Sequence, residues 1–249
     1  MSRRVLVTGA ARGIGRAVAE AFAGTGARVA VHYGRSADQA AEVVASLPGA
    51  GHVLVQADMS EAEDVRRAVD SAAERLGGLD ALVNNAGVFL AHPPMETSWE
   101  DWQAAWTATL QTNLVGAAHA TFAAIPHLVS AGGGAVVNVS SRGAFRGEPN
   151  NPAYGASKAG LNAFGQSMAR ALAPYGIWVG TVAPGFVDTD MARDVLEGPE
   201  GDGVRGQSPF GRVARPDEVA AAVLWLASPA AKFASGAIID VNGASYLRS

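Results

Sequence analysis

The sequence predicts an α/β protein built on one parallel sheet with helices on both faces. Short runs rich in β-branched residues alternate with longer alanine-rich stretches, and the runs are apolar on both faces, as buried parallel strands are. Alternation of this kind, with right-handed crossovers, gives a doubly wound sheet. The chain has 249 residues, 49% of them hydrophobic, and no linker divides it. We therefore expect a single domain over residues 1–249.

The β-branched runs and the helical patterns give the expected elements in order. We expect strands at Val5–Thr8, Arg28–Tyr33, Val53–Gln56, Ala81–Asn84, Ala135–Ser140, Ile177–Val182 and Ala237–Val241. We expect helices at Gly15–Ala23, Ala37–Leu47, Glu61–Leu76, Trp99–Ser130, Pro152–Ala173 and Pro216–Ala227. Residues 188–215 break this alternation, because they are rich in Gly, Asp and Glu with weak periodicity. Such a stretch in a compact domain is usually a lid or binding loop.

Composition excludes several classes of function. The net charge of −4 shows no excess that points to nucleic acid or to a membrane surface. The absence of cysteine excludes disulfides, thiolate metal sites and cysteine nucleophiles. The five histidines are scattered, so no metal site is expected. No apolar run has the length of a membrane span, and the first residues lack a signal-peptide core, so we expect a cytoplasmic protein.

The first expected strand ends in a glycine-rich turn that opens the first helix. The turn reads Gly9-Ala10-Ala11-Arg12-Gly13-Ile14-Gly15. Glycines permit close backbone approach to a pyrophosphate, and a helix N-terminus offers free N–H groups and partial positive charge. The alternative is an ordinary strand–helix turn. The location after the first strand favours dinucleotide binding.

The end of the second expected strand indicates which dinucleotide is bound. An NAD site usually has an acid there, but this strand runs into Tyr33-Gly34-Arg35-Ser36. Arg35 would attract a 2′-phosphate, Ser36 could donate to it, and Arg12 can approach the same group. The sequence therefore favours NADP(H). The alternative is that Arg35 is a solvated surface residue.

A tyrosine and a lysine four residues apart suggest the reacting centre. Tyr154 and Lys158 begin an expected helix and share one of its faces. A phenol ordinarily has a pKa of about 10. A nearby ammonium favours the phenolate, so the pair could exchange a proton with a substrate oxygen. Ser141, at the carboxyl end of the fifth strand, could hold that oxygen. Each of these residues alone has a plain structural alternative, as a helix-surface pair or a turn residue.

Together these motifs resemble the short-chain dehydrogenase/reductase family along essentially the whole chain. The resemblance implies a Rossmann-type sheet with strand order 3-2-1-4-5-6-7. It also implies a catalytic tetrad in which Tyr154 is the acid or base, Lys158 lowers its pKa and binds ribose, Ser141 orients the carbonyl and Asn113 holds a relay water. It further implies a homotetramer or homodimer. The residues expected to bind cofactor are Gly9, Arg12, Gly13, Ile14, Gly15, Tyr33, Arg35, Ser36, Asp58, Met59, Asn85, Ala86, Gly87, Tyr154, Lys158, Pro184, Gly185 and Thr189.

We expect an NADP(H)-dependent enzyme acting on a small-molecule carbonyl or secondary alcohol. The resemblance is broadest to 3-oxoacyl-(acyl-carrier-protein) reductases. However, the basic residues that carrier-protein users tend to show near the fifth strand are absent. Arg142 and Arg146, beside Ser141, could bind an anionic substrate or be solvated. The alternatives are an NAD(H)-dependent sugar or polyol dehydrogenase and, ranked lower, a dinucleotide-sensing protein without turnover.

Overall fold

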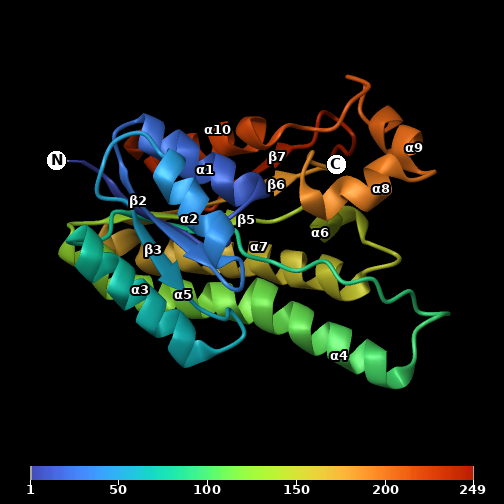
Figure 1. Cartoon of the computed structure of the whole chain (residues 1–249), viewed down its shortest axis with the longest axis horizontal. Helices are drawn as coiled ribbons and strands as arrows, with labels where there is room; N and C mark the ends of the chain where they lie inside the picture. Colours follow the sequence, from blue (N-terminus) through green and yellow to red (C-terminus); the bar gives the residue numbers. More distant parts are fainter. Residues whose placement is uncertain (1, 249) are drawn as a thin grey trace.

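A computed structural model describes residues 2–248 (Figure 1). Its centre is a seven-stranded parallel sheet in the order β3-β2-β1-β4-β5-β6-β7, which confirms the expected fold class and strand order. The strands are β1 Arg4–Val7, β2 Arg28–Tyr33, β3 Val53–Gln56, β4 Ala81–Asn84, β5 Gly134–Val139, β6 Ile177–Pro184 and β7 Ile238–Val241.

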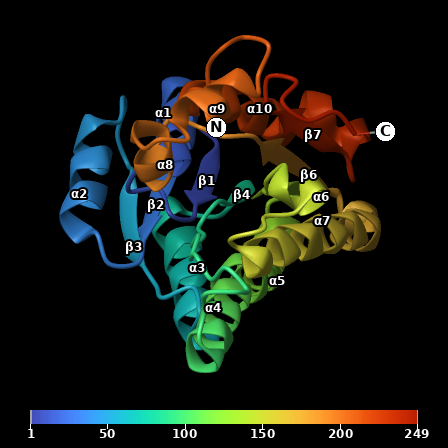
Figure 2. The ribbon, with the colours of Figure 1, turned by 90° about the vertical axis from the view of Figure 1, so that its right-hand side faces the viewer.

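Helices cover both faces of this sheet. Helices α1, α2 and α10 lie on one face and α3, α5 and α7 on the other (Figures 1 and 2). The bounds are α1 Gly13–Gly24, α2 Ala37–Ser46, α3 Ala62–Leu76, α4 Trp99–Leu110, α5 Gly116–Ser130, α6 Gly143–Arg146, α7 Pro152–Leu172, α8 Arg193–Glu197, α9 Gly201–Gly206 and α10 Pro216–Ala227. Single turns complete the set, a π-helical one at η1 Gln111–Val115 and 3₁₀ turns at η2 Ala173–Tyr175, η3 Asp190–Ala192 and η4 Pro229–Ala234.

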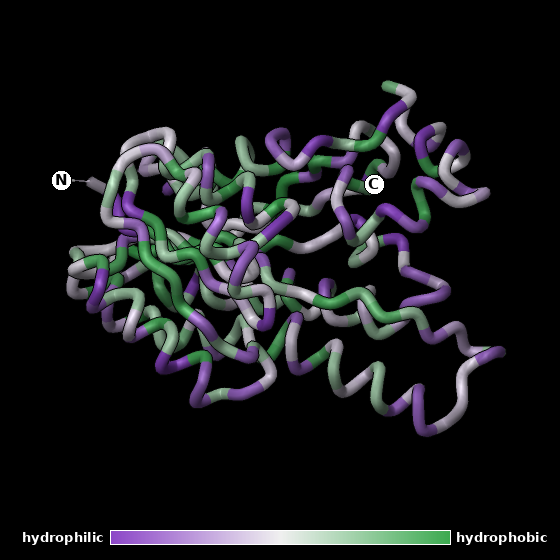
Figure 3. Tube along the Cα trace, viewed as in Figure 1, coloured by the Kyte–Doolittle hydropathy of each residue, from purple (hydrophilic) through white to green (hydrophobic). Residues whose placement is uncertain are grey.

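Successive side chains of each strand point to opposite faces of the sheet and pack into two hydrophobic cores, one on each face. In β1, Val5 and Val7 pack into the core under α1 and α10, while Leu6 packs into the core against α3 and α5. All residues of β5 and β6 are buried, as expected for central strands covered on both faces. Figure 3 shows the strands as apolar segments inside a more polar shell.

The sheet order reverses between β1 and β4, and this reversal fixes where a ligand can bind. Crossovers run outward from β1 toward β3 and outward from β4 toward β7, so a crevice opens at the strand carboxyl ends between the two halves. The segment 188–215, expected to lack regular structure, instead contains η3, α8 and α9 and lies beyond this edge (Figure 1, orange). Helices of five and six residues are too short to give the periodicity that sequence analysis detects.

Two further differences concern the helices. The helix expected over Trp99–Ser130 contains the π turn η1, and α6 was not expected. Within residues 2–248, no helix combines the length and the hydropathy that crossing a membrane requires.

Candidate active site

One cavity of about 830 Å³ occupies the crevice at the carboxyl ends of the strands. Its volume is in the range of small-molecule and cofactor sites. The residues that line it include every expected cofactor-binding residue together with Ser141, Tyr154 and Lys158. Asn113 alone among the expected site residues does not line it. The sequence therefore identified residues that the fold brings into one place from the ends of six strands and from α7.

The glycine turn approaches the segment after β4 closely. Gly9 has a φ of +63°, and a Cβ there would lie 2.8 Å from the Cα of Ala86. Gly13, with a φ of +55°, begins α1, and the end of this helix faces the cavity. Both positions require glycine for backbone conformation, and Gly9 requires it also for space. The turn thus presents backbone N–H groups without side chains in the way, as a phosphate site needs.

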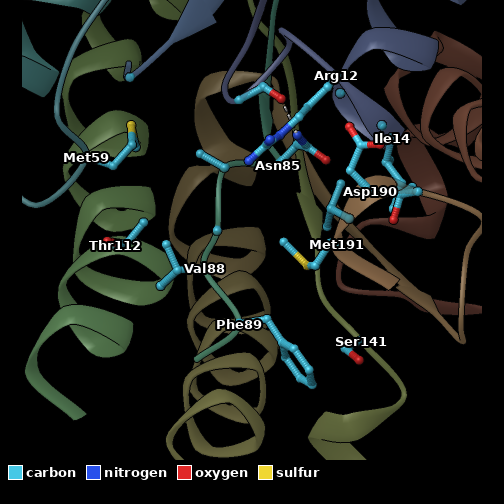
Figure 4. Close-up of a pocket in the computed structure, with 18 of the residues that line it drawn as sticks. Arg12, Ile14, Met59, Asn85, Val88, Phe89, Thr112, Ser141, Asp190 and Met191 are labelled. Atoms are coloured by element: carbon cyan, nitrogen blue, oxygen red, sulfur yellow. Dashed lines mark hydrogen bonds between the residues drawn. The ribbon is translucent and has the colours of Figure 1, made fainter. Parts of the chain in front are cut away.

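Thr8 and Asn85 fasten this turn to β4. The hydroxyl of Thr8 accepts hydrogen bonds from the backbone N–H of Asn85 at 2.9 Å and of Ala86 at 3.1 Å. The Asn85 amide donates to the carbonyl oxygens of Thr8 and Gly9 at 2.9 and 3.0 Å. Figure 4 shows Asn85 beside Arg12 at the upper end of the cavity. These bonds hold the two halves of the crevice at a fixed separation.

A buried histidine, not singled out from the sequence, supports the turn from the other side. His32 on β2 accepts the Gly9 N–H at Nδ1, 3.0 Å away, and its Nε2 lies 3.2 Å from the carbonyl oxygen of Ala57. Since Nδ1 accepts, Nε2 carries the proton. Burial lowers the pKa of His32 to about 4, which keeps the ring neutral and Nδ1 free to accept. A β2 histidine has no sequence signature of its own, because its role depends on the turn it faces.

The end of the cavity beside Arg12 and Arg35 carries positive charge. After β2, Arg35 is exposed and Ser36 is half-buried, and both line the cavity, as does the exposed Arg12 in the turn. Ser36 is the N-cap of α2 but makes no capping hydrogen bond, so its hydroxyl is available to a ligand. Asp58 accepts from the N–H and hydroxyl of Ser60. These bonds lower the pKa of Asp58, and the charge of Arg35 lowers it further.

Ser141 and Tyr154 lie together at the opposite end. The Ser141 Oγ accepts from the N–H of Gly143 at 3.0 Å, which leaves its proton free to donate. Burial raises the pKa of Tyr154 to about 12, and the nearby Ser141 hydroxyl acts in the opposite direction. The Tyr154 ring packs edge-on against Phe89 with centroids 4.7 Å apart.

Lys158 faces the same ring from one helical turn away. Its Nζ lies 5.7 Å from the centroid of the Tyr154 ring and donates to the carbonyl oxygen of Val139 at 2.8 Å. Burial lowers the pKa of Lys158 to about 8. In the protein without a bound dinucleotide, burial outweighs any lowering of the Tyr154 pKa by Lys158.

Asn113 lies behind the cavity wall, in the π turn. Its Oδ1 accepts the Val88 N–H at 2.8 Å, and its Nδ2 donates to the Val88 carbonyl at 3.0 Å and to the Ser157 Oγ at 3.1 Å. A Cβ on Gly87 would lie 3.2 Å from Asn113 Oδ1 and 3.6 Å from Lys158 Nζ. The glycine thus leaves open space between these two polar groups.

The segment after β6 closes the cavity near Ser141. Pro184 ends β6, Gly185 donates its N–H to the Val241 carbonyl, and Thr189 Oγ1 lies 3.3 Å from the Val187 carbonyl. Figure 4 shows Met191 and Phe89 reaching toward the part of the cavity that contains Ser141.

A carboxylate near the reacting centre was missed by the sequence analysis. Glu148 lines the cavity, its Oε2 lies 3.5 Å from Arg146, and its charge acts to raise the pKa of Tyr154. Only its location between Ser141 and Tyr154 in the sequence could have suggested it. No group of three or more potential metal ligands occurs in the described part of the chain.

Comparisons with known proteins agree with this geometry. The family described as "Enoyl-(Acyl carrier protein) reductase" matches residues 9–244. The 3-oxoacyl-[acyl-carrier-protein] reductase of Staphylococcus aureus is 36% identical over 249 residues, covering 99% of both proteins. The cis-4-hydroxycyclohexanecarboxylate dehydrogenase of Sinomonas cyclohexanicum is 40% identical, over 97% of this chain and 95% of the relative. A crystal structure of a short chain dehydrogenase from Burkholderia cenocepacia in complex with NADP superposes with a TM-score of 0.88 at 38% identity, over 98% and 97% of the chains.

Proposed function

Because the chain belongs to the short-chain dehydrogenase/reductase family of oxidoreductases, we propose that it transfers a hydride between NADP(H) and the carbonyl or secondary alcohol carbon of a small molecule. The observation that carries this proposal is one cavity with the glycine-rich turn Gly9–Gly15 at one end and Ser141, Tyr154 and Lys158 at the other. When bound, the dinucleotide supplies or accepts the hydride, and the protein supplies position and polarity.

Cofactor binding is assigned to the expected residues. The turn Gly9–Gly15 would hold the pyrophosphate, Arg12, Arg35 and Ser36 the 2′-phosphate, and Asp58 the adenine. Asn85, Ala86 and Gly87 would border the cofactor, with Pro184, Gly185 and Thr189 at its nicotinamide end. Three features support NADP(H) over NAD(H) as the cofactor. Arg12 and Arg35 are exposed cations in the cavity wall, the Ser36 hydroxyl makes no capping bond, and no acid directly follows β2.

Proton transfer is assigned to Tyr154. In reduction, the carbonyl carbon accepts the hydride while the Tyr154 hydroxyl gives its proton to the oxygen, so that ketone, hydride and proton become an alcohol. A pKa near 12 keeps Tyr154 protonated at neutral pH, ready to donate. Oxidation needs the phenolate, which the Lys158 ammonium and a positively charged nicotinamide ring would stabilise.

Ser141 and Asn113 support that transfer. The Ser141 hydroxyl, held by the Gly143 N–H, would donate to the substrate oxygen and orient it. The second lone pair of Asn113 Oδ1 and the Lys158 ammonium both face the space beside Gly87, which suits a relay water. Asn113 also fixes Val88, in the cavity wall, through two hydrogen bonds.

The remaining assignments concern the whole chain. We assign residues 1–249 to one catalytic domain, with residues 188–215 as a substrate lid, because Asp190, Met191 and Val195 from this segment line the cavity. We assign a homotetramer, with a homodimer as the alternative, because Phe122 on α5 is 77% exposed and Phe233 in η4 is fully exposed. The cytoplasm is the compartment we assign.

Turnover tests the proposal. Purified protein is mixed with NADPH and a panel of ketones, acyl thioesters and sugars, and absorbance of NADPH is followed. We expect consumption of NADPH with at least one ketone. NADPH binding without consumption by any compound would favour the dinucleotide-sensing alternative, and tighter binding of NADH than of NADPH would favour the NAD(H)-dependent polyol dehydrogenase.

A further inference from the structure

Arg142, directly after Ser141, is a buried cation in the wall of the substrate end of the cavity. It is 3% exposed and lines both the main cavity and a neighbouring one of about 380 Å³. Its guanidinium donates to the hydroxyl of Ser245 and to the side-chain oxygen of Gln207, and it lies 5.1 Å from the centroid of the Phe186 ring. All three contacts are with uncharged groups.

No carboxylate of residues 2–248 lies within 4.0 Å of the Arg142 guanidinium, whereas most arginines of this chain have such a partner. Two charged neighbours act on it from further away: Arg146 repels it and Glu148 attracts it, with Arg146 the stronger. The Glu148 carboxylate is itself paired with Arg146. A buried cation without a close counter-charge is unfavourable unless something else supplies the negative charge.

We infer that a carboxylate of the substrate supplies that charge, so that the substrate class is an oxo acid or the corresponding hydroxy acid. This inference rests on the proposed function and adds a second recognition point to it. Ser141 would hold the reacting oxygen, and Arg142, the next residue, would pair with the distant carboxylate through the guanidinium N–H groups that Gln207 and Ser245 leave free.

The cavity wall around Ser141 and Arg142 suits a substrate with a short apolar chain between its carbonyl and its carboxylate. Phe89, Phe186, Met191 and Val195 line the same cavity. Burial lowers the pKa of Arg142 only to about 10, so the guanidinium remains charged at neutral pH.

Matched pairs of substrates test the inference. The initial rates with NADPH are compared for 4-oxo, 5-oxo and 6-oxo acids and for their methyl esters, which carry the same ketone without the charge. We expect at least one acid to have a kcat/KM well above that of its ester. Arg142→Met should lower kcat/KM for the acid by about 10- to 100-fold and leave that for the ester little changed. Arg142→Lys should retain part of the preference, because it keeps the charge but not the planar fork.

Two controls separate recognition from a structural role. Gln207→Leu removes a lid contact of Arg142 but keeps the charge, and the ratio of acid to ester should persist. Arg66→Met removes one exposed charge from α3, far from the cavity, and should change neither rate. Equal rates for every acid and its ester, or equal losses for both in Arg142→Met, would overturn the inference.

A binding measurement keeps the test independent of turnover. Calorimetric titration of the wild type in the presence of NADPH should detect binding of pentanoate but not of pentanamide. In Arg142→Met, the heat of pentanoate binding should be lost. If ketones and esters are reduced but pentanoate and pentanamide bind alike, the inference fails and the proposed function stands. If no ketone is reduced yet pentanoate binds through Arg142, the proposed function fails instead.

Discussion

At the scale of single residues, the reacting centre combines two buried groups with opposite pKa shifts. Burial raises the pKa of Tyr154 to about 12 and lowers that of Lys158 to about 8. Both shifts disfavour the charged form, as expected for groups taken out of water. Tyr154 therefore keeps its proton at neutral pH beside a Lys158 that is mostly an ammonium, and it is prepared to donate. Ligand charges in the cavity would influence how readily it does so.

The phosphate assignment at Arg35 is tested by comparing two dinucleotides. Arg35→Ala should raise the Kd of NADPH by about 10- to 100-fold, because a charge-assisted hydrogen bond to the 2′-phosphate is lost. The Kd of NADH should stay the same, since NADH lacks that phosphate. Fluorescence titration measures both values. An exposed arginine remote from the cleft, Arg170, provides the control as Arg170→Ala. An equal rise in the Kd of NADPH and of NADH would show that Arg35 does not bind the 2′-phosphate.

Residues with a fixed chemical purpose could be predicted from the sequence, and residues defined by their neighbours could not. Gly9, Tyr154 and Lys158 belong to sequence motifs whose residue spacing indicates a function. His32 and Glu148 carry no such mark, because their roles come from the Gly9 N–H and the Tyr154 hydroxyl that folding brings beside them. The sequence likewise shows the ammonium four residues from Tyr154 but not the depth of burial, which dominates the pKa of Tyr154.

At the scale of elements, the start of α7 determines where Tyr154 lies, and a histidine from another segment holds it. Asn151, the N-cap of α7, makes no side-chain capping bond. Instead, His92 Nε2 accepts the N–H of Ala153, the residue before Tyr154, at 3.1 Å. His92 Nδ1 therefore donates to the Leu90 carbonyl at 2.8 Å. The ring is 1% exposed and packs against Trp102.

We expect His92→Ala to lower the free energy of unfolding by about 1–3 kcal/mol, because it leaves the buried Ala153 N–H without a partner. It should also lower kcat more than it raises KM, since Tyr154 would be less well placed. His92→Gln, whose side-chain oxygen can accept the same N–H, should recover part of both losses. Urea denaturation and steady-state rates provide the measurements. A His92→Ala protein with wild-type kcat would show that Tyr154 is positioned without this bond.

Element boundaries show where local signals suffice. The expected β2, β3, β4 and α10 have the observed bounds, because each is bracketed by turn residues or a proline. The π turn at Gln111–Val115 left no trace in the pattern, since one extra residue in a turn barely shifts helical periodicity. That turn nevertheless carries Asn113, so the missed irregularity coincides with a site residue.

At the scale of the whole molecule, the strand order could be predicted only through family resemblance. Alternation of strands and helices indicates a parallel sheet, but it does not say that the chain returns to β1 and reverses direction at β4. That reversal creates the cavity. Of the expected site residues, all but Asn113 line it. The sequence left open whether Arg142 binds an anionic substrate or is solvated, because its burial without a carboxylate beside it is a property of the folded chain.

The most direct test of the account is turnover by Tyr154→Phe, which removes one hydroxyl and keeps the ring that packs on Phe89. The account predicts an unchanged Kd for NADPH and a kcat for ketone reduction lower by about 10²- to 10⁴-fold. Wild-type kcat in this variant would contradict it, because no other group in the described cavity is assigned to deliver the proton.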